Sequence, residues 1–442
     1  ITHNFAQNGG GIRISNGTLS MKNSSIHSNY SDIGGGIYIS DGDIVFDPIE
    51  RSSIYLNSAN EGRDLYVNES FFVDVVLDTF TVLNPNEIFA TPINNFTFDI
   101  LNIPFTPISA DIYVSVNGDN NNSGLTVNDS FQTINKALTV IESDSLIPRN
   151  IFISEGIYSP STNGEIYPLY LKSNVSLIGN SMEATILDGE FSTNGIIFGY
   201  FQSGISLMNL TIENASSDYG GGINAISTSL NLENIKIQNC SANRGGGLSL
   251  TYGSSSNAFN LHIINCHASE KGGGIYNSST SVFENGILSG STAVSYGGGI
   301  YSDHAQINNF QIINNTAHSG GGIYAYGNIT LQNCNIENNV ADFQGGGLFS
   351  NSWSNTNLTN TDIKYNSAGM SGGGIYFKGN NVEFNLESLC SIFGNNAFEG
   401  MDLFATFSSS NQIIVNLDTF STTIPTTGFY TVRRQMIWDK IS

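Results

Sequence analysis

The sequence predicts an all-β fold, a right-handed parallel β-helix (β-solenoid), and three observations predict it. The triplet Gly-Gly-Gly recurs in two clusters at a spacing of 23 to 27 residues, a period that indicates a solenoid. Between triplets the apolar residues alternate with a period of two, as in strands, and Gly, Asn and Ser separate the runs. Helical patterning is nearly absent, so each period is interpreted as one coil of three short strands and three turns. The triplets lie at residues 9–11, 34–36, 220–222, 245–247, 272–274, 297–299, 320–322, 345–347 and 372–374.

A second signature precedes the triplets: an apolar residue, Asn three positions later and Ala five positions later. Identical positions of successive coils lie directly above one another in a solenoid, so the repeated Asn predicts a column whose amides bond along the axis. The Gly triplets predict positive φ and close backbone approach. We expect a structural role for both columns. The predicted ladder residues are Asn4, Asn57, Asn315, Asn339, Asn366 and Asn395.

An aromatic residue usually follows the Ile or Leu that comes after each triplet. Because that Ile or Leu points inward, strand alternation predicts an outward column of rings. One interpretation is a side-face surface for another protein or a glycan. The alternative is self-stacking that stiffens the coils. The rings of this candidate partner surface are Tyr276, Tyr301, Tyr324, Phe349 and Tyr376.

The same register places the four cysteines. Cys240 and Cys266 occupy the ladder position in adjacent coils, where Cα atoms about 5 Å apart would allow a disulfide. Two stacked free thiols are an equally favoured alternative to the disulfide. Cys334 and Cys390 share another position two coils apart, too far to bond, and are interpreted as small buried hydrophobes.

The sequence also repeats at a second period, much longer than one coil. The segment Ile54–Phe80 corresponds to residues 392–420, at an offset of 338 to 340 residues. We therefore expect tandem modules of about 340 residues, and a chain that begins inside a coil predicts neighbouring modules or copies end to end. The predicted divisions are 1–100 for the C-terminal part of one module, 101–110 for an inter-module segment, and 111–442 for a nearly complete second module, with an N-terminal strand and cap helix at 111–145, coils at 150–405 and a C-terminal cap at 406–442.

Two resemblances follow from these motifs. The pair of signatures, Ile-x-x-Asn-x-Ala and then Gly-Gly-Gly-Ile-Tyr, resembles the Phe-x-x-Asn and Gly-Gly-Ala-Ile repeats of the chlamydial polymorphic outer membrane proteins. This resemblance covers about residues 1–66 and 205–405, with Ile in place of Phe and Gly in place of Ala. It implies a β-helical, surface-exposed adhesin.

The second resemblance is carried by residues 111–119, Ser123-Gly124 and 131–138, which are similar to the opening of pectin-lyase-like right-handed β-helix proteins. It implies a short helix that plugs the N-terminal end of the coils. Ser130 is the expected N-cap, and Ile134, Ala137 and Leu138 are expected to be buried.

Composition excludes several classes of function. The chain has 442 residues, with 15 basic and 37 acidic side chains and a net charge of −22, so nucleic acid is not an expected partner. No apolar run reaches the roughly 18 residues of a membrane span. The 39% hydrophobic content is ample for a large core.

The resemblance to pectin-lyase-like folds, which include polysaccharide lyases and hydrolases, makes catalysis a further hypothesis. Those reactions need paired carboxylates, or a base beside calcium-binding carboxylates, whereas Asp303, Asp342, Asp362 and Glu383 fall in different registers. The histidines show no metal-binding spacing. The loop 117–122 offers oxygen ligands for calcium, but an Asx-rich turn is the favoured interpretation. We expect no enzyme, catalytic residue, metal or cofactor.

The sequence therefore predicts a secreted or cell-surface structural protein, a rod-like module of an extracellular filament or appendage. The alternative is a surface adhesin that binds host or neighbouring cells, through a glycan or a cell-surface protein, with its side face. A polysaccharide lyase or hydrolase is the least favoured hypothesis. The acidic surface would permit bridging by divalent ions. Candidate N-glycosylation sites include Asn68, Asn174, Asn209, Asn314 and Asn357.

Overall fold

The computed structural model describes residues 1–442 except 60, 69, 192–194, 379–381, 386–387, 407–412, 416, 422–435 and 439–442. It confirms an all-β parallel β-solenoid, of about 16 turns, with almost no helix. The chain divides into two compact units, Ile1–Pro107 and Ile108–Ser442, which are described separately. Most of the segment 406–442, the predicted C-terminal cap, lies outside the described residues.

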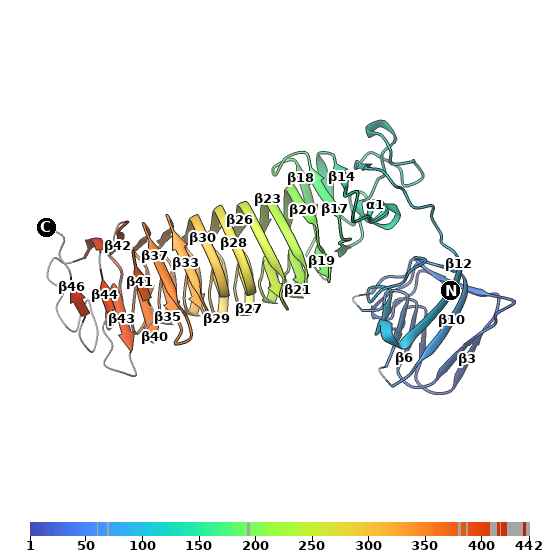
Figure 1. Ribbon diagram of the computed structural model, residues 1–442, viewed down its shortest axis with the longest axis horizontal. Coiled ribbons are helices and arrows are strands. Elements are labelled where there is room, and N and C mark those ends of the chain that lie inside the picture. The colour runs from blue at the N-terminus through green and yellow to red at the C-terminus, as the bar shows by residue number, and fades with distance from the viewer. Residues whose placement is uncertain are drawn as a thin grey trace. The chain divides into compact units, whose positions relative to one another are not determined.

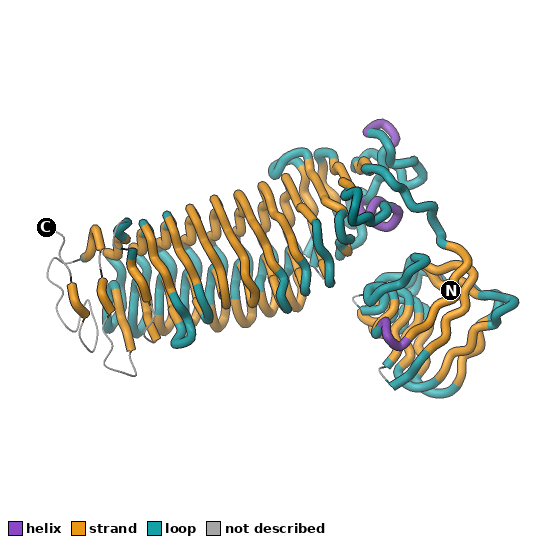
Figure 2. The backbone as a smooth tube through the Cα atoms, in the orientation of Figure 1, coloured by secondary structure: helices purple, strands orange, loops and turns teal. Residues whose placement is uncertain are grey.

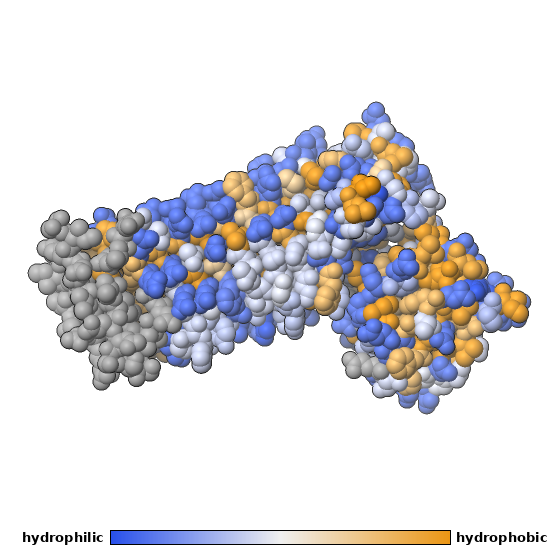
Figure 3. Space-filling model, viewed as in Figure 1, coloured by the Kyte–Doolittle hydropathy of each residue, from blue (hydrophilic) through white to orange (hydrophobic). Residues whose placement is uncertain are grey.

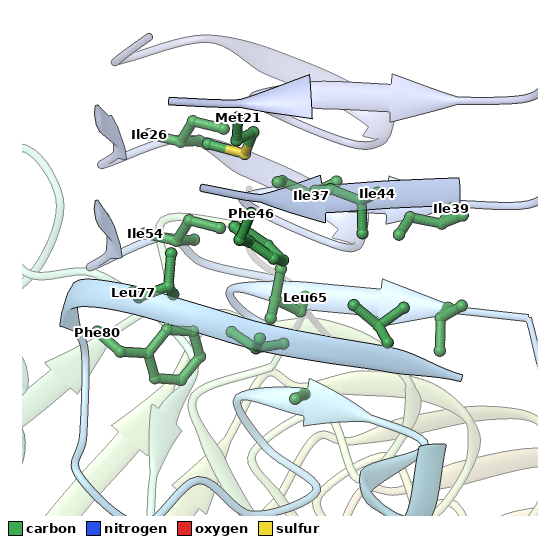
Figure 4. Packing of buried hydrophobic residues seen from close by; sticks show 14 of the residues in the cluster. Met21, Ile26, Ile37, Ile39, Ile44, Phe46, Ile54, Leu65, Leu77 and Phe80 are labelled. Atoms are coloured by element: carbon green, nitrogen blue, oxygen red, sulfur yellow. The ribbon is translucent and has the colours of Figure 1, made fainter. Parts of the chain in front are cut away.

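Unit 1 (Ile1–Pro107) stacks its coils as four parallel sheets (Figure 1). Its core repeats from coil to coil: Ile26 pairs with Ile54, and Ile54 with Phe80, so that these side chains form one column (Figure 4). The four sheets are β1 (Phe5–Asn8) with β5 (Tyr30–Ile33); β12 (Phe96–Asn102), β10 (Val73–Phe80), β8 (Ser52–Tyr55) and β4 (Ser25–His27); β11 (Ala90–Thr91), β9 (Leu65–Val67), β6 (Ile37–Ile39) and β2 (Ile12–Ile14); and β3 (Thr18–Met21) with β7 (Asp43–Phe46).

Unit 2 (Ile108–Ser442) stacks strands of successive coils side by side, with turns between them (Figure 2). A seven-stranded parallel sheet precedes the Gly triplets. Its strands are β21 (Ser216–Tyr219), β24 (Ser241–Arg244), β27 (His267–Lys271), β29 (Thr292–Tyr296), β31 (Thr316–Ser319), β35 (Val340–Gln344) and β39 (Ser367–Ala368). A separate pair is β44 (Ile413–Val415) and β46 (Met436–Trp438).

The other strands of unit 2 join one continuous hydrogen-bonded sheet, because several long strands cross the bends between faces. These strands are β13 (Ile112–Val114), β14 (Arg149–Ile153), β15 (Gly156–Tyr158), β16 (Leu169–Tyr170), β17 (Val175–Gly179), β18 (Thr185–Asp188), β19 (Ile197–Tyr200), β20 (Ile205–Glu213), β22 (Ile223–Ile226), β23 (Ser229–Gln238), β25 (Leu248–Thr251), β26 (Ser255–Ile264), β28 (Ile275–Ser289), β30 (Ile300–Ile313), β32 (Ile323–Ala325), β33 (Ile329–Gln332), β34 (Asn335–Glu337), β36 (Leu348–Ser350), β37 (Thr356–Thr359), β38 (Asp362–Lys364), β40 (Ile375–Lys378), β41 (Val382–Phe384), β42 (Cys390–Phe393), β43 (Leu403–Thr406) and β45 (Leu417–Phe420).

The Gly triplets explain the tight packing at one corner of each coil. The first glycine, such as Gly320, has φ +66°, a left-handed conformation that disfavours a side chain. A Cβ on the second glycine, Gly321, would lie 2.4 Å from the carbonyl oxygen of Val340 in the next coil. The second position therefore excludes side chains because the neighbouring backbone occupies their place.

The only α-helix among the described residues, α1 (Ile134–Val140), contacts β13, β14 and β16. Ile134, Ala137 and Leu138 are buried as expected, but the N-cap is Thr133, whose hydroxyl accepts from the Lys136 backbone N–H. The expectation of Ser130 was wrong because the helix begins later than predicted. Two 3₁₀ turns are η1 (Ile93–Asn95) and η2 (Val127–Asp129).

Candidate functional site

The predicted asparagine ladder of unit 2 is a buried chain of hydrogen bonds. The side-chain Nδ2 of Asn315 donates to Oδ1 of Asn339 at 3.0 Å, and Asn339 and Asn366 bond in the same way to the next Asn at 2.9 and 3.0 Å. Each Oδ1 also accepts the backbone N–H of the preceding ladder residue. The second Nδ2 hydrogen of Asn339 goes to the carbonyl of Ile312. These amides therefore act as internal ties between coils.

Unit 1 has a ladder of the same kind. Asn4 donates to Asn29 at 2.9 Å, and Asn29 donates to Asn57 at 3.0 Å. Asn29 was not among the predicted ladder residues, because Ser31 stands where the signature has Ala. The triplet at 34–36, which follows directly, was the signal that could have placed it.

Each ladder ends on a buried carboxylate. Oδ1 of Asp64 accepts from both the backbone N–H and Nδ2 of Asn57, and Asp402 does the same for Asn395. Both aspartates stand where other coils have the third glycine, in Gly-Arg-Asp and Gly-Met-Asp. Burial raises the pKa of Asp64 to about 6, against the lowering effect of hydrogen bonds from Thr81 and Asn57. Burial likewise raises the pKa of Asp402.

The ladder column continues through Ser291 to the two stacked cysteines. The backbone N–H of Cys266 donates to the hydroxyl of Ser291, and the N–H of His267 donates to the carbonyl of Cys240. Cys240 and Cys266 are free, buried thiols in this structure, and the disulfide stays a prediction. The neighbouring Cys266 thiol is the largest cause, ahead of burial, that raises the pKa of Cys240.

The other two cysteines are buried and free as well. Thr361 lies between them in the stack, since its hydroxyl accepts from the Cys334 N–H and its carbonyl accepts from the Ser391 N–H next to Cys390. Burial raises the pKa of Cys334 and that of Cys390 to about 11. Both thiols therefore stay protonated near neutral pH, as expected of small core residues.

The aromatic column departs from the expected exposed surface. Its five predicted rings and Phe404 stack face to face, and neighbouring centroids are 4.6 to 5.4 Å apart. No residue of the column is more than 9% exposed. The column therefore offers a partner little ring area, and the self-stacking alternative describes it better. Its residues are Tyr276, Tyr301, Tyr324, Phe349, Tyr376 and Phe404.

Side chains from the neighbouring sheet cover the flank of this column. Lys271 places its Nζ 4.9 Å from the centroid of the Tyr301 ring, and the Tyr296 ring lies 4.7 Å from that of Tyr324. These contacts combine cation–π attraction with burial. Burial also raises the pKa of Tyr324 to about 12, so its hydroxyl stays protonated.

A further column of asparagines was not singled out from the sequence. Its members have φ between +43° and +58°, and they sit where the strands bend between two faces of the solenoid. Asn tolerates this left-handed conformation better than most residues. The signal was present as an Asn directly before the core position of each coil, every 24 to 27 residues. This bend column comprises Asn209, Asn234, Asn260, Asn285, Asn309, Asn333 and Asn360.

A groove of about 470 Å³ lies against the middle of the bend column. Four of its lining residues are Asn260, Asn285, Asn309 and Asn333. Other lining residues are His262, Ile287 and Gln311, which pair with one another across β26, β28 and β30. On the visible face of unit 2, hydrophilic residues are interspersed with hydrophobic ones (Figure 3).

The candidate glycosylation sites differ in exposure. Asn68, Asn314 and Asn357 are exposed, whereas Asn174 and Asn209 are half-buried. The amide of Asn209 is also engaged, since its Oδ1 accepts from Asn234 and its Nδ2 donates to the Gly179 carbonyl. Glycosylation of these sites stays a prediction.

Side-chain oxygens of the loop 117–122 accept hydrogen bonds within the loop and from the residues that lead into α1. Oδ1 of Asn120 accepts the backbone N–H groups of Gln132 and Thr133, and Oδ1 of Asp119 accepts from Asn121. Among the described residues, no group of three or more His, Cys, Asp or Glu side chains could hold a metal ion. No helix in that part of the chain has the length and apolarity needed to cross a membrane.

The four carboxylates considered as catalytic candidates, Asp303, Asp342, Asp362 and Glu383, lie on different strands. Asp303 is on β30, Asp342 on β35, Asp362 on β38 and Glu383 on β41. Burial raises the pKa of Asp303, and Asp362 lies 3.6 Å from the Lys364 ammonium. These positions supply no observed pair of facing carboxylates.

Comparison with solved structures finds several proteins at low sequence identity and low structural similarity. A complex of XylC with xylose is 11% identical over 68% of this chain and 75% of that chain, with a TM-score of 0.38. A rhamnogalacturonan lyase is 13% identical over 71% and 87%, with a TM-score of 0.37. A pectin methylesterase from carrot is 11% identical over 64% and 90%, with a TM-score of 0.34. Similarity at this level transfers no activity.

No curated protein sequence matches this chain significantly. None of these comparisons bears on the resemblance to the chlamydial outer membrane proteins. A family model does match within unit 2: residues 116–317 are similar to the family described as "Protein of unknown function (DUF1565)".

Proposed function

We propose that this chain is a structural element of an extracellular or cell-surface assembly, a rod-like β-solenoid module that extends and stiffens a filament or appendage. The observation that supports it is the inner ladder, which runs through buried side chains from Asn315 to Asp402 and has a counterpart from Asn29 to Asp64. A repeated tie between coils is what a load-bearing solenoid requires.

The coils of unit 2 are joined in three ways. Parallel backbone pairing runs through the stack, the ladder adds buried amide bonds, and the aromatic column adds ring stacking. A buried hydrogen bond contributes about 1 kcal/mol net, and an aromatic pair about 0.5–1.5 kcal/mol beyond its burial. Because these contributions recur in the coils between Asn315 and Phe404, bending or separating those coils costs several of them at once.

A structural role also accounts for how the repeated polar residues are used. The ladder amides of Asn339 and Asn366 are saturated by protein partners and are buried, so they are not available to a substrate. We therefore assign no catalytic role to the repeated residues. The net charge of −22 favours a well-solvated surface that divalent ions could bridge.

Adhesion through the side face is the second candidate function. The aromatic column gives it little support because its rings are buried. The groove at the bend column supports it better, since it presents amides on an outer face. A single chain could serve both roles, with the inner ladder stiffening the rod and the outer face contacting a ligand.

Immunogold electron microscopy of intact cells that produce the chain tests the proposed function. Antibodies against the full chain should label material outside the cell, arranged along filaments or appendages. Labelling that requires permeabilised cells would contradict an extracellular role. A genetic deletion should remove or soften the appendage, and an unchanged appendage would contradict the structural role.

A further inference from the structure

The bend column is hydrogen-bonded in short runs. Within each run, Nδ2 of one Asn donates to Oδ1 of the Asn before it, as in Asn234 to Asn209 and Asn260 to Asn234, both at 2.9 Å. Further along, Asn309 bonds to Asn285, and Asn360 bonds to Asn333 at 2.7 Å.

Two junctions of the column lack this bond in the described part of the chain. No side-chain bond joins Asn285 to Asn260, and none joins Asn333 to Asn309. Each junction therefore presents one acceptor, the Oδ1 of Asn260 or Asn309, and one donor, the Nδ2 of Asn285 or Asn333. All four asparagines line the groove.

The two junctions repeat along the solenoid axis. The two junctions are two coils apart, a distance of about 10 Å at the spacing of paired strands. A ligand that satisfies both must offer a donor and an acceptor close together and offer them again about 10 Å further on. Hydroxyl groups meet the first requirement because each both donates and accepts.

The residues that line the groove also determine which ligand charge it favours. Its lining contains no Asp, Glu, Lys or Arg. Burial, followed by the nearby charge of Lys236, lowers the pKa of His262 and keeps that ring neutral near pH 7. Because no charged side chain lines the groove, it favours an uncharged ligand over an ionised one.

An extended peptide fits this repeat poorly. Its residues rise about 3.3 Å each, so three residues span about 10 Å, and groups three residues apart point to opposite sides. A chain of sugar rings carries hydroxyls on every ring, and its C–H faces can pack on a side chain such as Ile287 between the polar groups. The groove volume of about 470 Å³ lies in the range of small-ligand sites.

We infer that this groove is a binding site for an extended, neutral glycan chain that lies along the solenoid axis and bonds to the amides at the two open junctions. Oδ1 of Asn260 and Asn309 accept from sugar hydroxyls, and Nδ2 of Asn285 and Asn333 donate to them. The inference goes beyond the structural role, because a rod could extend a filament with this groove empty.

Isothermal titration calorimetry of the full chain tests this inference with a panel of hexasaccharides. The neutral probes are cellohexaose, xylohexaose, mannohexaose, laminarihexaose and chitohexaose, and hexagalacturonate is the anionic probe. At least one neutral probe should bind saturably, and hexagalacturonate should bind more weakly.

Two variants locate the site without disturbing the fold. Asn285→Gly and Asn333→Gly each remove the open Nδ2 donor, together with the Oδ1 that accepts from Asn309 or Asn360, and glycine accepts the φ of +52° and +53° at these positions. Each variant should weaken binding about three- to tenfold, the effect of one hydrogen bond. The matched control is Asn239→Gly, which has φ +54° but does not line the groove, and it should bind like the parent chain.

Each possible outcome either supports or overturns the inference. Binding of a neutral probe that the two groove variants weaken and the control retains supports the inference. Absence of binding by any neutral probe at millimolar concentration, binding of hexagalacturonate alone, or equal binding by the groove variants would overturn it. Circular dichroism of each variant checks that the coils are intact. None of these results depends on whether the chain forms filaments.

Discussion

Asn395 donates its side-chain Nδ2 to Oδ1 of Asp402 at 2.9 Å, and Asn57 makes the same 2.9 Å bond to Asp64, 338 residues earlier in the chain. In both places the third glycine of the triplet has become the aspartate that accepts from the last ladder Asn. A carboxylate suits this position because it accepts from the Asn without requiring a further acceptor in the next coil. The Gly-x-Asp variant therefore marks where each ladder stops.

The buried carboxyl of Asp64 predicts that unit 1 is more stable in mild acid than at neutral pH. Its folded-state pKa, about 6, lies above the ordinary value of 3.8, so its contribution to folding is fully present below about pH 4 and is lost as the pH rises through 6. We expect unit 1 to lose about 2–3 kcal/mol between pH 4 and pH 7.5 from this group. Hydrogen exchange of unit 1 peptides, corrected for the intrinsic exchange rates at each pH, measures it.

The control for this prediction is Asp64→Asn, which keeps an Oδ1 acceptor for Asn57 and removes the charge. This variant should lose that part of the pH dependence and should be more stable than the parent chain at pH 7.5. Equal pH dependence of variant and parent in unit 1 would contradict the assignment. Glu165 should act in the same direction in unit 2, because burial raises its pKa to about 7.

Removing one ladder amide should weaken the stack. Asn339→Ala leaves the backbone N–H and Nδ2 of Asn315 without their acceptor in a buried site. We expect a loss of about 2–5 kcal/mol in the free energy of unfolding, measured by urea denaturation. The neighbouring control, Asn338→Gly, replaces an exposed residue at φ +54° and should change stability by less than about 1 kcal/mol. A loss no larger than the control's would argue against the ladder as a tie between coils.

The second glycine of a triplet should tolerate no side chain. In Gly321→Ala the new Cβ would lie 2.4 Å from the Val340 carbonyl oxygen and 2.5 Å from that of Gly346. The backbone would have to move, at a cost of about 3–5 kcal/mol. Gly253→Ala is the control, since its φ is +81° but no atom lies within 4 Å, and strain alone should cost about 1 kcal/mol. Thermal unfolding followed by circular dichroism compares the two, and equal melting temperatures would refute the close-approach explanation.

The aromatic column should contribute through its rings rather than its hydroxyls. Tyr324→Ala removes a buried ring that stacks on Tyr301 and Phe349, and we expect a loss of about 3–5 kcal/mol. Tyr324→Phe should stay within about 1 kcal/mol of the parent chain, because Phe349 fills the same position of the column without a hydroxyl. A large loss in Tyr324→Phe would show instead that the hydroxyl matters. Urea denaturation of both variants distinguishes the two cases.

Much of the architecture could be predicted from the repeat signatures, because stacking of coils requires the same residue type at the same position of each coil. A residue such as Gly321 is forced by the backbone of the next coil, and a residue such as Asn339 by its amide partners above and below. Such positions recur with the coil period and can be found by eye. Asn29 was not predicted because Ser31 stands where the signature has Ala.

Exposure was harder to predict than register. Strand alternation points Tyr301 outward, but it does not reveal that Lys271 and the adjacent rings cover it from the side. The bend column escaped for a different reason: asparagine is abundant throughout the chain, and only the positive φ of residues such as Asn285 separates this column from other turns. Contacts between neighbouring faces of a coil depend on three-dimensional curvature, which a linear pattern does not contain.

Cryo-electron microscopy of the native material that contains this chain tests the central claim most directly. A structural role predicts continuous filaments built from stacked coils, with a strong axial spacing of about 4.8 Å in their power spectra and a longer repeat near the length of one module. Separate monomeric rods, with no end-to-end continuity in the native material, would contradict it.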